Sequence, residues 1–235
     1  MWIDIVYLNK FYKSDLGIFT QKTITRALEE LWEIKPHHRI LGLGYAPPFL
    51  QTLSESVSHC IAAMPSYQGA TPWPSSGPCR TTLIHEHELP FQDTFFDKIL
   101  LVHMMGYTAH VKEMLREAWR VLADEGEIVL IVPNRFGIWS HIETTPFGQS
   151  MPYTSLQLKH ILVESCFIPL ESRKVLYTPP IRNPTLLKLI APLEGLCQRW
   201  INVAPGVLIV KAKKQVYAKA LPIKAKKWAR ALAPR

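Results

Sequence analysis

Hydrophobic positions follow two different spacings along the chain, and each spacing predicts a different kind of element. Apolar side chains recur every three or four positions in residues 20–33 (TQKTITRALEELWE), which predicts an amphipathic helix. Residues 38–44 (HRILGLG) and 96–105 (FDKILLVHMM) are instead almost continuously apolar. Runs of this kind are typical of strands in a parallel sheet, because helices cover such a sheet on both faces.

Strand and helix patterns alternate up to Asn134. Two prolines follow the first strand, but proline is tolerated in the first turn of a helix, so residues 47–56 are predicted to be helical. Further strands are predicted at 58–65, 81–84 and 126–134. Thr108 is expected to cap a helix before the last of them, and residues 65–80, rich in proline and glycine, form an irregular connection. We therefore expect an α/β fold, a Rossmann-like doubly wound sheet with helices on both faces and a ligand at the carboxyl ends of the strands.

The order of patterns changes beyond Asn134. Helices are predicted at 154–166 and 183–200, and extended segments at 167–179 and 206–214. We expect one domain over residues 1–210, in which residues 178–204 form an insertion that covers the pocket.

The net charge of +8 is concentrated at the C-terminus. Residues 211–235 contain nine Lys or Arg and no acid, whereas the first 210 residues contain 18 basic and 19 acidic side chains. A basic tail of this kind could bind RNA or an anionic membrane surface, with Tyr217 and Trp228 available for stacking or insertion. It could equally be a solvated terminus that keeps the protein soluble, and the sequence leaves both alternatives open.

The cysteines and the N-terminus bear on the compartment. The four cysteines include no CxxC pair, so they indicate neither a zinc site nor a disulfide framework. The N-terminal sequence MWIDIVYLNK lacks the basic start and apolar run of a signal peptide, and the apolar stretches are only as long as strands. We expect a cytoplasmic protein without a transmembrane segment.

The segment RILGLGYAPPFL, residues 39–50, has the pattern of a strand that ends in a glycine loop. Glycines in such a loop let the backbone approach a nucleotide, while an acid at the strand end holds the ligand by hydrogen bonds. Gly42 and Gly44 are present here, but the loop contains no carboxylate. The sequence therefore indicates a nucleotide-type loop that has lost its usual acid.

Two longer motifs carry a resemblance to a known family. ELPFQDTFFDKILLVHMM (88–105) is followed, after the predicted helix, by LREAWRVLADEGEIVLIVPN (115–134). In order and spacing they resemble the LPF-x-D-x-x-FD and RVL-x-x-x-G signatures of class I S-adenosylmethionine-dependent methyltransferases of the type 11 group. FYKSDLG and TTPFGQSMPY also resemble a bacterial subset of this group with the same divergent loop. The resemblance covers about residues 36–135 and implies a sheet of about seven strands, with S-adenosylmethionine as cofactor.

The resemblance assigns cofactor positions to the glycine loop. Gly44, Ala46 and Pro48 fall on the three glycine positions of the family loop, and Gly42 occupies the position of its acid. Residues 42–46 would approach the methionine part of the cofactor, with backbone N–H groups from Gly44 to Ala46 available to it. Tyr45 would either cover the cofactor or pack beneath the turn.

The resemblance also assigns positions for the adenosine part. Met64 ends the second strand, where the family has its ribose-binding carboxylate. Glu86 aligns with the acid that accepts the adenine amino group, with His87 as its neighbour, and the adenine could lie between Met64 and Phe91. Losing the ribose acid removes hydrogen bonds worth about 1.5–3 kcal/mol each, so binding is weakened unless another group substitutes.

His103 follows the fourth strand, close to where the family presents its methyl donor. Methyl transfer depends mainly on alignment, and a base within reach of the acceptor's proton assists it. His103 is the first candidate for a catalytic base, with His141 or Tyr153 behind it, and its alternative role is a structural bond to the backbone. His85 and His87 alternate and could face one ligand, but no third metal ligand stands at a recognisable spacing, so no metal site is predicted.

We thus expect an S-adenosylmethionine-dependent methyltransferase with an unidentified acceptor. The alternative is a catalytically inactive methyltransferase fold that serves as a binding or assembly protein, with RNA held by the basic tail. Binding of the cofactor distinguishes the two.

Overall fold

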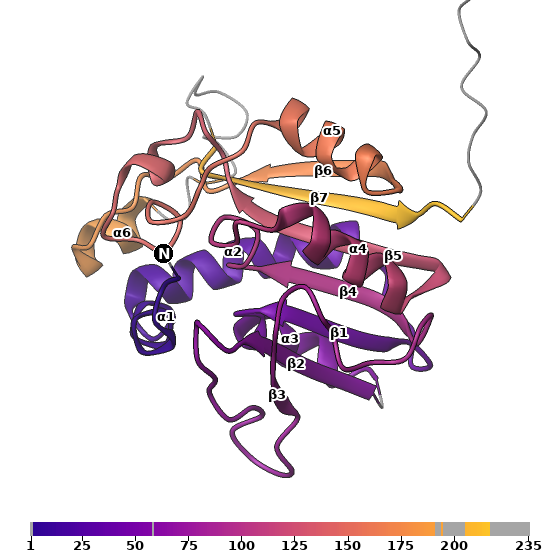
Figure 1. The fold of residues 1–235 in the computed structure, drawn as a ribbon. Coiled ribbons are helices and arrows are strands. Elements are labelled where there is room, and N and C mark those ends of the chain that lie inside the picture. Colours follow the sequence, from indigo (N-terminus) through magenta and orange to yellow (C-terminus); the bar gives the residue numbers. More distant parts are fainter. Residues whose placement is uncertain (1, 58, 191–193, 195–204, 217–235) are drawn as a thin grey trace, which may run out of the picture.

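The computed structural model describes residues 2–57, 59–190, 194 and 205–216, and its main feature is one sheet (Figure 1). Seven strands lie in the order β3-β2-β1-β4-β5-β7-β6. They are β1 (Arg39–Gly44), β2 (His59–Pro65), β3 (Thr81–Ile84), β4 (Phe96–Val102), β5 (Leu122–Pro133), β6 (Phe167–Val175) and β7 (Val207–Lys214). Strands β1 to β5 are parallel, and β7 pairs antiparallel with both β5 and β6. The predicted doubly wound sheet is confirmed.

Helices cover both faces of this sheet. They are α1 (Ile5–Tyr12), α2 (Asp15–Leu31), α3 (Pro47–Ser54), α4 (Val111–Val121), α5 (Ser155–Glu164) and α6 (Pro184–Ile190), with a short 3-10 helix η1 (Ile138–His141). Buried side chains of α1, α2 and α3 share one apolar cluster with Leu100 of β4, whereas those of α4 and α5 share a second cluster with Leu101. Because successive strand residues point to opposite faces, the two clusters lie on the two sides of the sheet.

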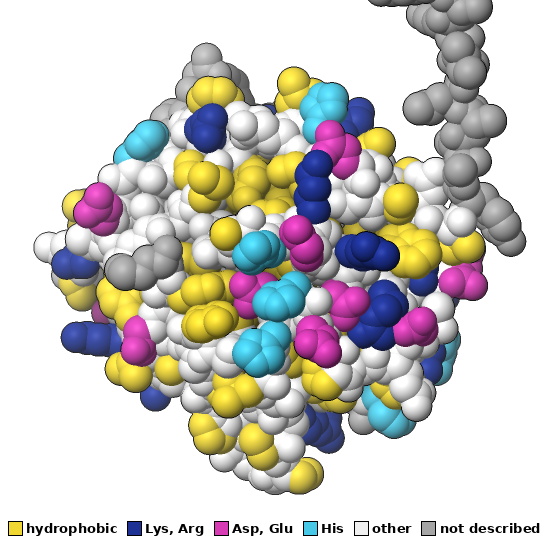
Figure 2. Space-filling view, viewed as in Figure 1, with side chains coloured by type: hydrophobic (Ala, Val, Ile, Leu, Met, Phe, Trp, Pro, Cys, Tyr) yellow, Lys and Arg dark blue, Asp and Glu magenta, His cyan; other side chains and the backbone are white. Residues whose placement is uncertain are grey.

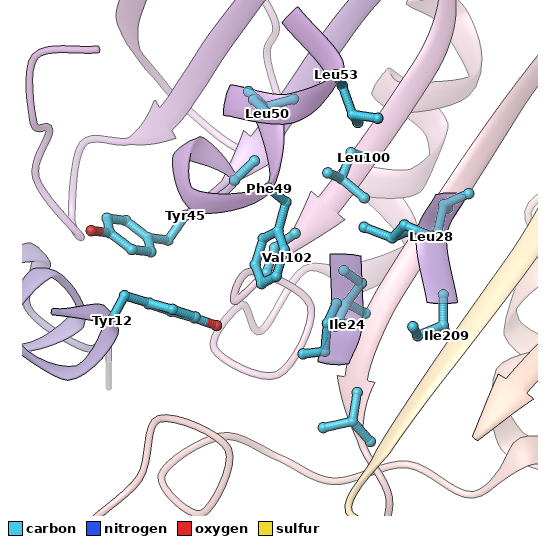
Figure 3. Packing of buried hydrophobic residues seen from close by; sticks show 14 of the residues in the cluster. Tyr12, Ile24, Leu28, Tyr45, Phe49, Leu50, Leu53, Leu100, Val102 and Ile209 are labelled. Atoms are coloured by element: carbon cyan, nitrogen blue, oxygen red, sulfur yellow. The ribbon is translucent and has the colours of Figure 1, made fainter. Parts of the chain in front are cut away.

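The first cluster fixes α2 and α3 over the centre of the sheet. Figure 3 shows Ile24 and Leu28 of α2, together with Phe49 of α3, near Leu100 and Val102 of β4. None of the five is more than 1% exposed. Burial of such a side chain contributes about 1.5–3 kcal/mol, so this contact is a main source of stability for the β1–α3 unit.

Two details at helix starts differ from the predictions. Helix α1 was not predicted, and α2 begins at Asp15 because the Ser14 side chain caps it by accepting from Gly17 N at 3.1 Å. The predicted cap at Thr108 is wrong, since α4 begins at Val111. The Thr108 hydroxyl accepts from His110 N at 3.0 Å and serves the preceding loop instead.

Strand β7 includes three lysines of the expected basic tail. Lys211 Nζ donates to Leu31 O at 2.9 Å, Lys214 Nζ donates to Leu122 O at 2.6 Å, and Lys213 pairs with Glu125. These cations hold the end of the sheet. The remainder of the expected tail, residues 217–235, lies outside the described residues.

Helix α6 bears out the first half of the predicted 183–200 helix. Asn183 Oδ1 accepts from Thr185 N at 3.0 Å, as its predicted role in starting the helix requires. Most of the expected cover, beyond Ile190, lies outside the described residues and stays a prediction. Within the described part of the chain, no helix is long and apolar enough to cross a membrane.

Candidate functional site

The loop between β1 and α3 is packed tightly against the rest of the protein. Gly44 has a φ of 77°, and a Cβ at this position would come within 2.1 Å of the Val102 carbonyl oxygen. A Cβ at Gly42 would lie 2.5 Å from Leu50 Cδ1. Both glycines are therefore required by the fold, independently of any ligand.

The backbone amides of this loop are largely engaged within the protein. Tyr45 N donates to Val102 O at 2.9 Å, and Ala46 N donates to Gly44 O at 3.1 Å. The two residues that open α3 are Pro47 and Pro48, which have no N–H, and Phe49 N donates to Ala46 O at 2.9 Å. The prediction that amides up to Ala46 are available to a ligand is therefore wrong for Tyr45 and Ala46.

Tyr12, at the end of α1, closes the corner above His103. Its hydroxyl lies 2.7 Å from His103 Nε2, and its ring lies 5.6 Å from that of Tyr45 (Figure 3). Phe147 also packs against the His103 ring, with 4.9 Å between the ring centroids. His103 is only 5% exposed and Tyr45 4%, so the side chains of the protein itself fill the corner where the methyl donor was expected.

Burial fixes the protonation of this pair. It lowers the pKa of His103 to about 3 and raises the pKa of Tyr12 well above its usual value. The imidazole is therefore neutral and the phenol keeps its proton, so Tyr12 donates and His103 Nε2 accepts. The other role expected for His103 was a structural bond to the backbone, but the bond that the structure shows for its ring is to the Tyr12 side chain.

Gln68 is a buried polar residue that the sequence reasoning missed. It follows β2 by three residues, is 2% exposed and donates from Nε2 to the His103 carbonyl oxygen at 3.1 Å. Its Oε1 is buried without a hydrogen-bond partner among the described residues. A glutamine close after Met64, in a loop that must otherwise be solvated, is the only sequence signal that could have suggested it.

Glu86 lies in the turn after β3 and points inward, whereas its neighbour His87 is exposed. Glu86 is 4% exposed, and its Oε1 accepts from the Thr108 hydroxyl at 3.3 Å. Its Oε2 is buried and has no partner within the described part of the chain. An unpaired buried acceptor of this kind costs about 1–3 kcal/mol, which makes Glu86 a candidate ligand contact.

The predicted sandwich of adenine between Met64 and Phe91 is wrong. Met64 is fully buried in the cluster that contains α1, α2 and α3. Phe91 packs against the opposite cluster, with its ring edge-on to Phe96 at 5.0 Å. The two side chains therefore lie on different faces of the sheet and cannot hold one ring between them.

The remaining candidates for a catalytic base lie in unlike surroundings. His141 ends η1 and is exposed. Tyr153 is buried, and its hydroxyl donates to Met105 O at 3.1 Å. Neither contacts His103 through a hydrogen bond that the structure shows.

Histidines gather near Glu86 on the surface. The ring of His87 lies 6.3 Å from that of His85 and 6.0 Å from that of His110. Figure 2 shows histidines grouped with acidic side chains at the centre of this face. Among the described residues, however, no group of three or more His, Cys, Asp or Glu side chains is arranged to hold a metal ion.

S-adenosylmethionine would meet two different environments at the carboxyl ends of β2, β3 and β4. Glu86 and Gln68 each offer a buried, unpaired acceptor, which fits the donors of an adenine amino group and ribose hydroxyls. Beside His103, Tyr12 and Tyr45 fill the space, and the prolines of α3 remove helix-terminal amides. Glu86 and Gln68 thus offer acceptors that match the adenosine part, whereas the methionine part fits only if Tyr12 leaves His103.

Comparisons with known proteins agree with this fold. A family model described as a methyltransferase domain matches residues 28–130. No curated protein sequence matches the chain significantly.

Solved structures share the fold at low sequence identity. An S-adenosylmethionine-dependent methyltransferase from Archaeoglobus fulgidus is 17% identical, with a TM-score of 0.59 over 89% of this chain and 98% of the other. One from Thermotoga maritima is 14% identical, with a TM-score of 0.59 over 88% of this chain and 94% of the other. The cyclase SpnF also matches, with a TM-score of 0.55 at 15% identity over 83% of this chain and 80% of the other, so the fold alone does not define the reaction.

The strand order, the β1–α3 glycine loop and the matched segment agree with one another. The motif at 88–105 spans β4 and the turn before it, and the motif at 115–134 spans the end of α4 and β5, within or next to that segment. Residues 28–130 are thus similar to a methyltransferase domain, and the chain shares the fold of the solved methyltransferases compared above.

Proposed function

We propose that this protein is an S-adenosylmethionine-dependent methyltransferase whose donor corner opens when Tyr12 leaves His103. The observation that carries the proposal is the buried, unpaired Oε2 of Glu86 at the carboxyl end of β3. A carboxylate oxygen that accepts from an adenine amino group would remove the cost of this unpaired atom.

Gln68 supports the same proposal from the next strand. Its unpaired Oε1 follows β2, where the family's ribose acid is replaced by the buried thioether of Met64. An amide oxygen can accept from a ribose hydroxyl, although it is a weaker acceptor than a carboxylate. The chain would thereby keep part of the sugar contact that the missing acid used to provide.

His103 would act once Tyr12 has moved away. Bound S-adenosylmethionine would supply an electrophilic methyl group, and alignment of the acceptor with it would provide most of the acceleration. The neutral imidazole can hold the acceptor's proton at Nε2, the atom that now accepts from Tyr12. With a pKa of about 3 it is a weak base in the closed form, and contact with water would raise this pKa.

The closed corner favours a second candidate function. The Tyr12–His103 bond and the burial of Tyr45 also suit a methyltransferase fold that no longer transfers methyl groups and serves as a binding or assembly protein. Cofactor binding separates the two candidates.

Calorimetry with S-adenosylhomocysteine tests the proposal. We expect binding to the wild-type protein and affinity about ten- to a hundredfold weaker for Glu86→Ala, because a hydrogen bond to a charged acceptor is lost. Gln68→Leu should also weaken binding, by less. Glu88→Ala is the matched control, since Glu88 is exposed two residues away.

Two results would contradict the methyltransferase proposal. One is equal loss of affinity in Glu86→Ala and Glu88→Ala, with circular dichroism unchanged. The other is the absence of heat at millimolar ligand in both the wild-type protein and Tyr12→Phe, which would favour the binding-protein candidate.

A further inference from the structure

A cleft of about 540 Å³ lies where α1 meets α2, on the side of the 144–147 loop. Figure 1 shows α1 and α6 at the same end of the sheet, beyond the carboxyl ends of the parallel strands. Residues from α1, the start of α2, the 144–147 loop and the segment before α6 line this cleft. Its volume falls in the range of small-molecule sites.

The rim of the cleft carries three cations. Lys10, Lys13 and Arg182 line it, are exposed, and form no ion pair with an acid of the described chain. Among the described residues, Asp15 is the one acid that also lines it. Three positive charges against one negative charge leave a net positive rim, which would attract an anion.

The floor of the cleft is apolar. Phe11 and Leu16 are buried there, and Tyr7, which is half-buried, also lines the cleft. Burial raises the pKa of Tyr7, and the Arg182 charge partly opposes this rise, which places the guanidinium near the phenol. A ligand with an apolar body and an acidic group matches this floor and rim together.

One layer of side chains separates the cleft from the donor corner. The Phe11 ring contacts that of Phe147, with 6.5 Å between the ring centroids, and Phe147 contacts His103. Tyr12, which covers His103, directly follows Phe11 in α1. A shift of α1 that releases Tyr12 would therefore join the cleft to His103.

We propose that this cleft binds the carboxylate or phosphate of a small methyl acceptor whose apolar part lies on Tyr7 and Phe11. The role as acceptor rests on the proposed methyltransferase function, whereas the binding of the acidic group does not. Because the cations are exposed, each contributes modestly, and the site depends on their convergence.

NMR titration of the full-length protein at low salt, without cofactor, tests the site with three probes. Phenyl phosphate and phenylacetate carry the two acidic groups, and 2-phenylethanol is their neutral counterpart. We expect the two anions to bind more tightly than the alcohol, and to lose affinity as salt is added. The tighter of the two anions identifies the acidic group.

Variants locate the binding on the molecule. We expect weaker binding of both anions, by about threefold per charge removed, in Arg182→Gln and in the double variant Lys10→Gln with Lys13→Gln. The affinity for the alcohol should not change. Asp15→Asn should increase the affinity for both anions, because it removes a negative charge from the rim. Lys22→Gln is the control, because Lys22 is an exposed lysine of α2 that does not line the cleft.

Anion binding in the cleft and methyl transfer can each fail independently of the other. Three results would show that the cleft is not an anion site. The alcohol could bind as tightly as the anions, Lys22→Gln could lose as much anion affinity as the cleft variants, or neither anion could bind at millimolar concentration. Anion binding to a protein that shows no heat with S-adenosylhomocysteine would leave an anion site and overturn its role in methyl transfer.

Discussion

His103 has a φ of 48°, in the left-handed region that few non-glycine residues adopt. Two contacts hold it there: its carbonyl oxygen accepts from Gln68, and its ring accepts from Tyr12. Backbone conformations of this kind cost about 1–3 kcal/mol and persist where the surroundings impose them, often at functional sites. The strain therefore agrees with a role for His103 at the candidate site.

The buried neutral imidazole makes stability depend on pH. Burial lowers the pKa of His103 from 6.5 to about 3, so between these values the unfolded chain binds the proton more tightly. This residue's contribution is complete above pH 6.5 and is lost as the pH falls toward 3, at about 1.4 kcal/mol per pH unit. The free energy of unfolding in urea should therefore fall more steeply for the wild-type protein than for His103→Gln as the pH is lowered, so that the two values converge.

His103→Gln keeps an acceptor for Tyr12, so the test addresses the proton and not the hydrogen bond. Other titrating groups contribute to both curves and cancel in the difference. Two curves that stay parallel from pH 7 to pH 4 would mean that His103 does not bear a depressed pKa.

Sequence patterns located Glu86 but not Gln68. Glu86 lies two residues before the 88–105 motif, which fixes its alignment with the family, and its inward direction after β3 agrees with that assignment. Gln68 lies in an irregular loop, where no periodicity indicates which side chains turn inward. Its burial and its bond to His103, 35 residues away, follow only from the three-dimensional arrangement.

At the scale of elements, α1 decides whether the donor corner is open. Phe11 and Tyr12 at its end contact Phe147, Tyr45 and His103. Gly17 allows α1 to approach α2 closely, because a Cβ there would lie 1.9 Å from Phe11 O. Helix α1 is therefore a tightly fitted cover, attached by a backbone bond from Ile5 N to Gln68 O at 3.0 Å and by the side-chain bond from Tyr12 to His103.

Removing the bond from Tyr12 to His103 should lower the stability of the protein and strengthen ligand binding. Tyr12→Phe leaves His103 Nε2 buried without a donor, which should cost about 1–3 kcal/mol in urea unfolding. The same change should raise affinity for S-adenosylhomocysteine, since opening no longer breaks a hydrogen bond. Calorimetry and unfolding on one preparation measure both effects.

Tyr67→Phe is the control for this pair of measurements, because Tyr67 is 68% exposed. Lower stability with unchanged or weaker affinity would show that Tyr12 supports the site and does not close it.

Elements with strong local signals were predicted well, and α1 shows why others were not. The strands β1 and β4 are continuous apolar runs, which only a sheet covered on both faces explains. The eight residues of α1 (IVYLNKFY) are too few to establish a helical period. The contact between Tyr12 and His103 joins residues 91 positions apart, so no local pattern could indicate a closed corner.

At the scale of the whole molecule, most of the net positive charge lies after β7 in the sequence. Lys211, Lys213 and Lys214 bond to the body of the protein, which leaves six of the nine basic residues of 211–235 in residues 217–235. Removal of those six would reduce the net charge from +8 to +2. The basic segment and the sheet can therefore be tested independently.

Truncation after Val216 should keep the fold and abolish most electrostatic association with RNA or anionic vesicles. The slope of log K against log salt should fall toward zero for whichever partner the segment binds, because fewer counterions are released. Truncation after Val210 should instead unfold the protein, since Lys211 and Ala212 pair with both neighbouring strands. An unchanged salt slope after Val216 would place any such association on the body, where the cationic cleft of α1 is the surface to test next.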